Sequence, residues 1–233
     1  MIPGIYNYCD GRCPRCPFTQ RCLTFLDTQE LKDAGGSERS LAETVGDSLQ
    51  RTLEMLAEAA WRDGIDLESA GEEEAETAAS HDLERHREDP LAVRARAYGQ
   101  LAWRIGRAVA PIASARGDAP LVEAVATIEW FSSMISAKVY RAICGQAEGW
   151  EGADEAQTDF NGSAKIALIG IGESRRAWSV LMEAGRAAAD GVPAQAVRLL
   201  DELDADMRTR FPRVMEFVRP GFDEPAAAPG GGR

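Results

Sequence analysis

The sequence predicts an all-α protein, an antiparallel bundle of four to five long helices with a cysteine-rich metal-binding knuckle at its N-terminus. Three observations support this prediction. Apolar residues recur at helical spacing over several long stretches, no segment shows the period-two alternation of a strand flanked by hairpin turns, and four of the five cysteines fall within residues 9–22. Long helices joined by short connections favour an antiparallel arrangement.

We expect the chain to divide into a cysteine-rich knuckle over residues 1–30, a helical bundle over residues 37–218 and a disordered tail over residues 219–233. The tail is expected to be disordered because it ends in a Pro, Ala and Gly run of low complexity. Within the bundle, residues 66–88 form an acidic segment whose composition suits either a solvated surface helix or a mobile linker.

The first bundle helix is expected to begin near Ser37 and to end near Asp63. Ser40 and Glu43 have the spacing of a capping box, and Gly64 is a plausible end signal. Apolar residues then follow one face of this helix, at Leu41, Val45, Leu49, Leu53 and Leu56. Before it, Leu23 to Asp27 reads as a short hydrophobic continuation of the knuckle.

The second bundle helix is expected to start at Asp89-Pro90, an acidic N-cap residue followed by proline in the first turn. Its apolar face continues to Ile112, where Pro111 could kink the end of the helix. Further helices are expected over residues 120–145, 159–190 and 193–210, with a short apolar segment over residues 215–218.

The balance of charge excludes some classes of partner. The 233 residues carry a formal net charge of −12, and ten acidic residues against two arginines lie in residues 66–89. Such a chain would repel a nucleic-acid backbone, so we expect no nucleic-acid partner. The longest apolar stretch is far shorter than the roughly 20 residues that span a bilayer, and no targeting segment stands at the N-terminus. We therefore expect a cytoplasmic protein that does not bind membranes.

The N-terminal cysteines have the spacing of metal ligands. They are separated by Pro, Gly and Asp, so that four thiolates could converge on one soft ion or one cluster, at Cys9, Cys13, Cys16 and Cys22. In a reducing compartment, clustered cysteines are more often ligands or redox groups than structural disulfides. The Cys-Pro steps at Cys13 and Cys16 resemble those of ferredoxin-type ligation, which favours an iron-sulfur cluster, and zinc is the alternative cofactor.

Four thiolate ligands would make this metal structural or electron-transferring and not a Lewis acid. The spacing Cys9-x3-Cys13-x2-Cys16 also occurs in radical S-adenosylmethionine enzymes, whose cluster keeps one iron open for the substrate. That interpretation fails because the chain lacks the alternating strands of a barrel and because a fourth cysteine would close the open position.

Charged residues within otherwise apolar helices could form a second site. If the two helices that carry them face each other, the charges could line a polar pocket for a small anionic ligand, at Glu129, Lys138, Arg141, Lys165, Glu173 and Arg176. The alternative is that these charges lie on the outer faces of long helices. Cys144, in an apolar helical setting, is expected to be a packed core cysteine.

Two stretches resemble an uncharacterised bacterial all-helical family. They are the cysteine motif over residues 8–22, which has the form YCDxxCxxCPFTxRC, and the NGSAKxALI motif over residues 161–169. The resemblance covers most of the chain and brings no activity with it. It implies only that the two stretches belong to one functional unit. The chain departs from the family pattern at Gly11, where bulkier residues are common, and this leaves the ligand set unchanged.

The favoured function is metal binding, with the iron-sulfur cluster serving electron transfer or redox sensing and with a redox partner implied. The alternative is a bundle with structural zinc that acts as a small-ligand-binding or protein-interaction module. The residues do not assign a reaction, so no catalytic residue is named, and they do not define an oligomeric state.

Overall fold

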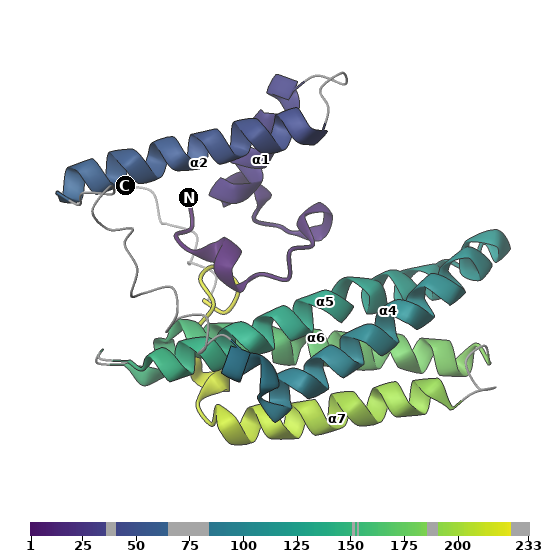
Figure 1. Ribbon diagram of the computed structural model, residues 1–233. Coiled ribbons are helices and arrows are strands. Elements are labelled where there is room, and N and C mark those ends of the chain that lie inside the picture. The colour runs from purple at the N-terminus through teal and green to yellow at the C-terminus, as the bar shows by residue number, and fades with distance from the viewer. Residues whose placement is uncertain (36–40, 65–83, 151, 153, 186–190, 225–233) are drawn as a thin grey trace, which may run out of the picture. The chain divides into compact units, whose positions relative to one another are not determined.

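The computed structural model describes residues 1–35, 41–64, 84–150, 152, 154–185 and 191–224 (Figure 1). Every regular element in these ranges is a helix, and they contain no strand, so the prediction of an all-α fold is confirmed. None of the described helices is long and apolar enough to cross a membrane. The expectations for residues 66–83 and for the end of the tail, residues 225–233, lie outside the described residues.

The chain divides into two compact units. The first comprises residues 1–6 and 12–82, and the second comprises residues 7–11 and 83–233. The short segment Asn7–Gly11 thus belongs to the second unit although it lies among residues of the first in the sequence. The helix that ends at Asp63, which the sequence analysis placed in the bundle, belongs to the first unit.

The described residues of the first unit include two short 3-10 turns and two helices. The turns are η2 (Cys13–Arg15) and η3 (Thr19–Arg21), and the helices are α1 (Leu23–Gly35) and α2 (Leu41–Asp63). The prediction for residues 23–27 was only a short hydrophobic continuation, whereas α1 extends for 13 residues. Three residues of the apolar face expected on α2, Leu49, Leu53 and Leu56, are exposed, with 57–65% of their surface accessible.

In the part of the second unit that the structure describes there are four long helices, α4 (Pro90–Arg116), α5 (Ala119–Glu148), α6 (Asp159–Glu183) and α7 (Val192–Arg210), with the turns η5 (Glu155–Gln157) and η6 (Val214–Glu216). The start of α4 is as predicted, because the Asp89 side chain caps the helix by accepting from the backbone N–H of Leu91 at 2.9 Å. Helix α4 continues through Pro111 and ends before Gly117, which has a φ of 63°.

The four long helices pack side by side (Figure 1). Helix α5 contacts both α4 and α6, and α7 contacts the same two helices. Close approach depends on glycine at particular positions: a Cβ atom on Gly170 of α6 would lie 2.8 Å from the Phe131 ring of α5. Residues 166–177 therefore form part of a closely packed helix.

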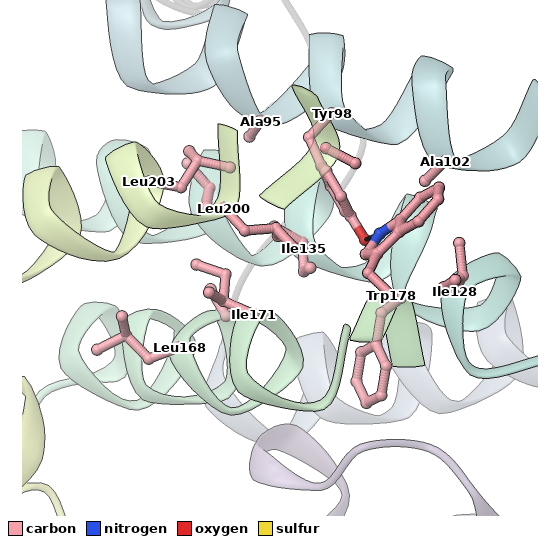
Figure 2. Packing of buried hydrophobic residues seen from close by; sticks show 14 of the residues in the cluster. Ala95, Tyr98, Ala102, Ile128, Ile135, Leu168, Ile171, Trp178, Leu200 and Leu203 are labelled. Atoms are coloured by element: carbon pink, nitrogen blue, oxygen red, sulfur yellow. Dashed lines mark hydrogen bonds between the residues drawn. The ribbon is translucent and has the colours of Figure 1, made fainter. Parts of the chain in front are cut away.

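The core of the second unit lies between these four helices (Figure 2). Its largest fully buried side chains include Trp178, Tyr98 and Phe131. The indole nitrogen of Trp178 donates a hydrogen bond to the Tyr98 hydroxyl at 3.3 Å, which satisfies the polar end of each ring away from water. Each such side chain stabilises the fold by about 1.5–3 kcal/mol through burial of apolar surface.

Candidate functional site

The four N-terminal cysteines are divided between the two units. Cys9 belongs to the second unit, and Cys13, Cys16 and Cys22 belong to the first. All four are half-buried, and none of the chain's five cysteines, all of which the structure describes, forms a disulfide. Within the described ranges, no three His, Cys, Asp or Glu side chains lie close enough together to hold a metal ion.

The backbone around Cys16 is turned so that its sulfur can accept hydrogen bonds. The 3-10 turn η2 places the Cys16 N–H 3.1 Å from the Cys13 carbonyl oxygen. Two residues later, the backbone N–H of Phe18 donates to Cys16 Sγ at 3.4 Å. Hydrogen bonds to sulfur favour the charged thiolate over the neutral thiol, and they tune the potential of thiolate-ligated clusters.

The segment that carries Cys9 is held against α5. Lys138 donates to the Asn7 carbonyl oxygen at 2.8 Å, and the indole nitrogen of Trp130 donates to the Asp10 carbonyl oxygen at 2.7 Å. Gly11 has a φ of 70°, and a Cβ atom there would lie 2.9 Å from the Trp130 ring. Glycine is favoured at this position for two reasons: it adopts a positive φ without strain, and it has no side chain to collide with the Trp130 ring.

Lys138 is half-buried beside Cys9. Burial lowers the pKa of its ammonium group, and repulsion from Arg141 lowers it further, whereas attraction to Cys9 and Asp159 acts in the opposite direction. The net shift is downward. Lys138 thus supplies a cation close to one of the proposed ligands.

Tyr8 connects the same segment to the start of α6. Its hydroxyl donates to Asp159 Oδ1 at 2.6 Å, while Arg141 contacts Asp159 Oδ2 through Nε at 2.9 Å and through a terminal nitrogen at 2.8 Å. The pKa of Tyr8 is raised well above its usual value, first by burial and then by the hydrogen bond and charge of Asp159. The hydroxyl therefore remains a donor.

The first turn of α6 is built to receive the Tyr8 ring. Thr158 caps the helix by accepting from the Asn161 N–H at 3.3 Å, and Asn161 Nδ2 donates to the Glu155 carbonyl oxygen at 2.8 Å. A Cβ atom on Gly162 would lie 2.3 Å from the Tyr8 ring and 2.7 Å from the Phe217 ring. The two stretches that the resemblance joins thus meet at Tyr8 and Gly162.

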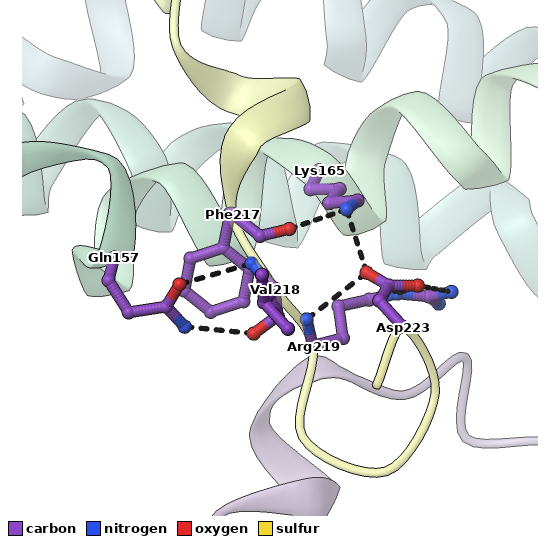
Figure 3. A network of polar contacts seen from close by, with 6 residues as sticks. All are labelled: Gln157, Lys165, Phe217, Val218, Arg219 and Asp223. Atoms are coloured by element: carbon purple, nitrogen blue, oxygen red, sulfur yellow. Dashed lines mark hydrogen bonds and ion pairs between the residues drawn. The ribbon is translucent and has the colours of Figure 1, made fainter. Parts of the chain in front are cut away.

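Lys165, one turn further along α6, reaches the C-terminal segment (Figure 3). Its ammonium group points between the Phe217 carbonyl oxygen and the Asp223 carboxylate, which is 2.7 Å away. Partial burial disfavours the charged form of Asp223, but hydrogen bonds from Arg219 and Lys165 outweigh this effect and hold the pKa of Asp223 well below its usual range. Residues 219–224, expected to be part of a disordered tail, are fixed by these contacts.

The structure does not bring the six residues of the predicted polar pocket into one contacting group. Lys138 and Arg141 lie together on α5, and Lys165 contacts the C-terminal segment. Glu129 is in contact with α4, because its Cγ would lie 2.4 Å from a Cβ atom on Gly106. Glu173 and Arg176 pair with each other along the outer side of α6.

Sequence reasoning missed Tyr8, Phe217 and Asp223 as the partners of this cluster. The signal available for Asp223 was its spacing from Arg219, since the two form an i,i+4 pair at 2.8 Å. Two polar atoms at the start of α6, Asn161 Oδ1 and Ser163 Oγ, are buried and make no hydrogen bond among the described residues.

Comparison with known proteins finds no match to any protein-family model, to the curated proteins or to the solved structures.

Proposed function

We propose that the chain is a metal-binding protein whose ligands are the thiolates of Cys9, Cys13, Cys16 and Cys22, and that an iron-sulfur cluster held there serves electron transfer or redox sensing. The observation that carries this proposal is the spacing of four cysteines within residues 9–22. Two features support it: all four cysteines are outside disulfides, and Cys16 Sγ accepts a backbone N–H at 3.4 Å.

The cations near these cysteines suit a negatively charged centre. Arg12, Arg15 and Arg21 lie between the proposed ligands in the sequence, and Lys138 is close enough to Cys9 to interact with its charge. Positive charge favours the thiolate form of a cysteine, which is the form that binds metal. In this proposal the four long helices act as an antiparallel bundle that carries the knuckle, and metal binding orders the loop that joins the ligands.

The alternative is structural zinc on the same four thiolates, in a protein that acts by binding a small ligand or a partner. Four cysteines satisfy the tetrahedral preference of zinc. Ligand binding is favoured by a groove along α4, which Arg96 and Ser136 line. In either case the protein is proposed to work in a reducing cytoplasm, where these thiols stay available to the metal.

The test is the absorption spectrum and metal content of protein purified without oxygen. An iron-sulfur protein should show a broad band near about 400 nm that bleaches with reductant, together with iron and sulfide. Replacement of one ligand by Cys16→Ser should remove the band and the metal. Colourless protein with about one zinc per chain would replace the first proposal by the second.

Cys144 supplies a matched control. It is the fifth cysteine and lies on α5, outside the motif. The variant Cys144→Ser should therefore keep the metal content of the unaltered protein. Loss of metal from both variants alike, or no metal in the unaltered protein after reconstitution with iron and sulfide or with zinc, would refute metal binding by the N-terminal cysteines.

A further inference from the structure

A groove runs along α4 in the second unit, on the side that faces α5. One hollow of about 570 Å³ is lined by Arg87, Arg96, Ser136 and Tyr140, among others. A second hollow of about 350 Å³ shares Arg96 and Ser136 with it and extends to Trp103. A third, of about 460 Å³, shares Trp103 with the second. The first two hollows form the groove, and the third lies on the α7 side of α4, next to Gln195 and Leu199.

The middle of this groove exists because α4 and α5 approach closely. A Cβ atom on Gly99 would lie 2.5 Å from the Ser132 carbonyl oxygen, so only glycine fits at this crossing. The absence of a side chain at Gly99, next to the small residues Ser132, Ser133 and Ser136, leaves the hollow open. The Ser132 and Ser136 hydroxyls already donate to the carbonyl oxygens of Glu129 and Ser133, at 2.6 and 2.9 Å, so the serines serve here mainly as small side chains that leave space.

The charge of α4 is opposite to that of the whole chain. This helix carries five arginines and no acidic residue, in a protein with a formal net charge of −12. Arg94 is neutralised by α7, through ion pairs with Glu202 and Asp206. No carboxylate among the described residues pairs with Arg96, which lines the first two hollows, or with Arg104, which lines the third.

The groove also offers a flat apolar surface beside these cations. The Trp103 side chain is 55% exposed, and the Arg107 guanidinium lies over its ring, 5.0 Å from the ring centroid. At the other end, the Arg87 guanidinium interacts with the Tyr140 hydroxyl. An indole face next to guanidinium groups suits a ligand that has a ring at one end and an anion at the other.

We propose that this groove binds a small aryl-bearing anion, a phosphate monoester or a carboxylate. Arg96, together with Arg87, binds the anionic group by charge-assisted hydrogen bonds, and the ring of the ligand packs on Trp103. The hollows have the size of small-molecule sites, which are typically about 300–1,000 Å³. The site consists of Arg87 and of α4 and α5 residues, all outside the cysteine motif, so it functions whether or not metal is bound.

The experiment is a calorimetric titration of the full chain with naphthyl phosphate. We expect saturable binding at one site, weakened at least about tenfold by Arg96→Gln because the variant loses a charge-assisted hydrogen bond to the anion. Arg116→Gln is the matched control: it removes the same charge from the same helix, about 30 Å away by helical rise, at an exposed position. This control should bind as the unaltered protein does.

Further titrations separate the two parts of the ligand. Neutral naphthol and inorganic phosphate should each bind at least about tenfold more weakly than naphthyl phosphate, and Trp103→Ala should weaken naphthyl phosphate but not inorganic phosphate. No saturable binding of naphthyl phosphate, equal loss in Arg96→Gln and Arg116→Gln, or equal binding of naphthol would overturn the proposal. The metal-ligand variant Cys16→Ser should bind naphthyl phosphate normally, so this test is independent of the metal proposal.

Discussion

Two groups of cations in the second unit differ in what they contact. In the first group, Lys138 of α5 and Lys165 of α6 donate to backbone carbonyl oxygens, and Arg141 of α5 pairs with Asp159 at the start of α6. Along α4, Arg96 and Arg104 line hollows and pair with no carboxylate among the residues that the structure describes. The first group holds chain segments together, and the second leaves its hydrogen-bonding capacity for a ligand.

This difference shows why a charged residue in an apolar helix does not by itself indicate a binding site. The cations predicted to line a polar pocket were those within apolar helical stretches. They include Lys165, which is only 9% exposed. A buried cation must already be satisfied by protein groups, because an unpaired buried charge is costly. The cations available to a ligand are instead those at a groove surface.

The largest expected effect is that of Lys165→Met. Removing the ammonium group leaves the buried Phe217 carbonyl oxygen without its donor and leaves Asp223 with Arg219 alone, so the free energy of unfolding should fall by about 3 kcal/mol. Urea denaturation followed by circular dichroism would measure this loss. Chymotrypsin should also cleave faster after Phe217, whose carbonyl oxygen Lys165 holds in place. A loss below about 0.5 kcal/mol, the range of ordinary surface changes, would contradict a stabilising role for Lys165.

Gly162→Ala should have the next largest effect. The added methyl group would meet the Tyr8 and Phe217 rings, and overpacking of this kind costs about 1–3 kcal/mol. Gly172 lies on the same helix with no atom within 4 Å of a Cβ atom placed there. Gly172→Ala should therefore stabilise the protein by up to about 1 kcal/mol through helix propensity. Equal thermal shifts of the same sign in both variants would show that the contact with Tyr8 is absent.

Tyr8→Phe should cost about 1 kcal/mol, the net value of one hydrogen bond. The variant keeps the ring contact with Phe217, whose centroid is 4.6 Å away, and removes only the donor to Asp159. A double-mutant cycle with Asp159→Ala isolates this interaction. Tyr8→Phe should then cost less in the Asp159→Ala background, and an equal cost in both backgrounds would rule out the pairing.

The Asp223 contacts also predict a dependence of stability on acid. The pKa of Asp223 is lower in the folded state than in the unfolded chain, so its contribution is fully present above the unfolded pKa of about 4 and is lost as pH falls through the folded value. Asp223→Asn should flatten this part of the curve of unfolding free energy against pH. If this curve kept its shape below about pH 4 in the variant, Asp223 would not contribute to the loss of stability in acid.

The smallest effect on stability is expected for Arg96→Gln. Arg96 is exposed and makes no ion pair among the described residues, so its replacement should change the free energy of unfolding by less than about 0.5 kcal/mol. Denaturation of this variant beside Lys165→Met tests the comparison directly. If Arg96→Gln destabilised the fold as much as Lys165→Met does, the two groups of cations would have the same role.

The sequence predicts those parts of the fold that depend only on neighbouring residues. Asp89-Pro90 starts α4 as expected, because a capping carboxylate and a proline at the first position are satisfied within one turn. Helix α1 was missed, since its 13 residues lack a pronounced apolar face. The grouping of Asn7–Gly11 with the second unit was also missed, because Lys138 and Trp130 lie more than a hundred residues away in the sequence.

The same limit applies to the sites. The cysteine spacing was visible because all of its members lie in one short stretch. The α4 groove was not noticed, although five arginines without an acidic residue can be read directly from residues 90–116. Its hollow requires Gly99 to face Ser132 across two helices, and a linear sequence does not give that pairing.

The contacts with Asn7 and Val218 have a consequence for how the sequence can change over time. Lys138 binds the main-chain oxygen of Asn7, and Gln157 binds both the N–H and the carbonyl oxygen of Val218. Every amino acid supplies that oxygen, and every one except proline also supplies the N–H. These contacts therefore allow many residue types at positions 7 and 218. Substitutions at Lys138 and Gln157, whose side chains make the contacts, are expected to be tolerated less well.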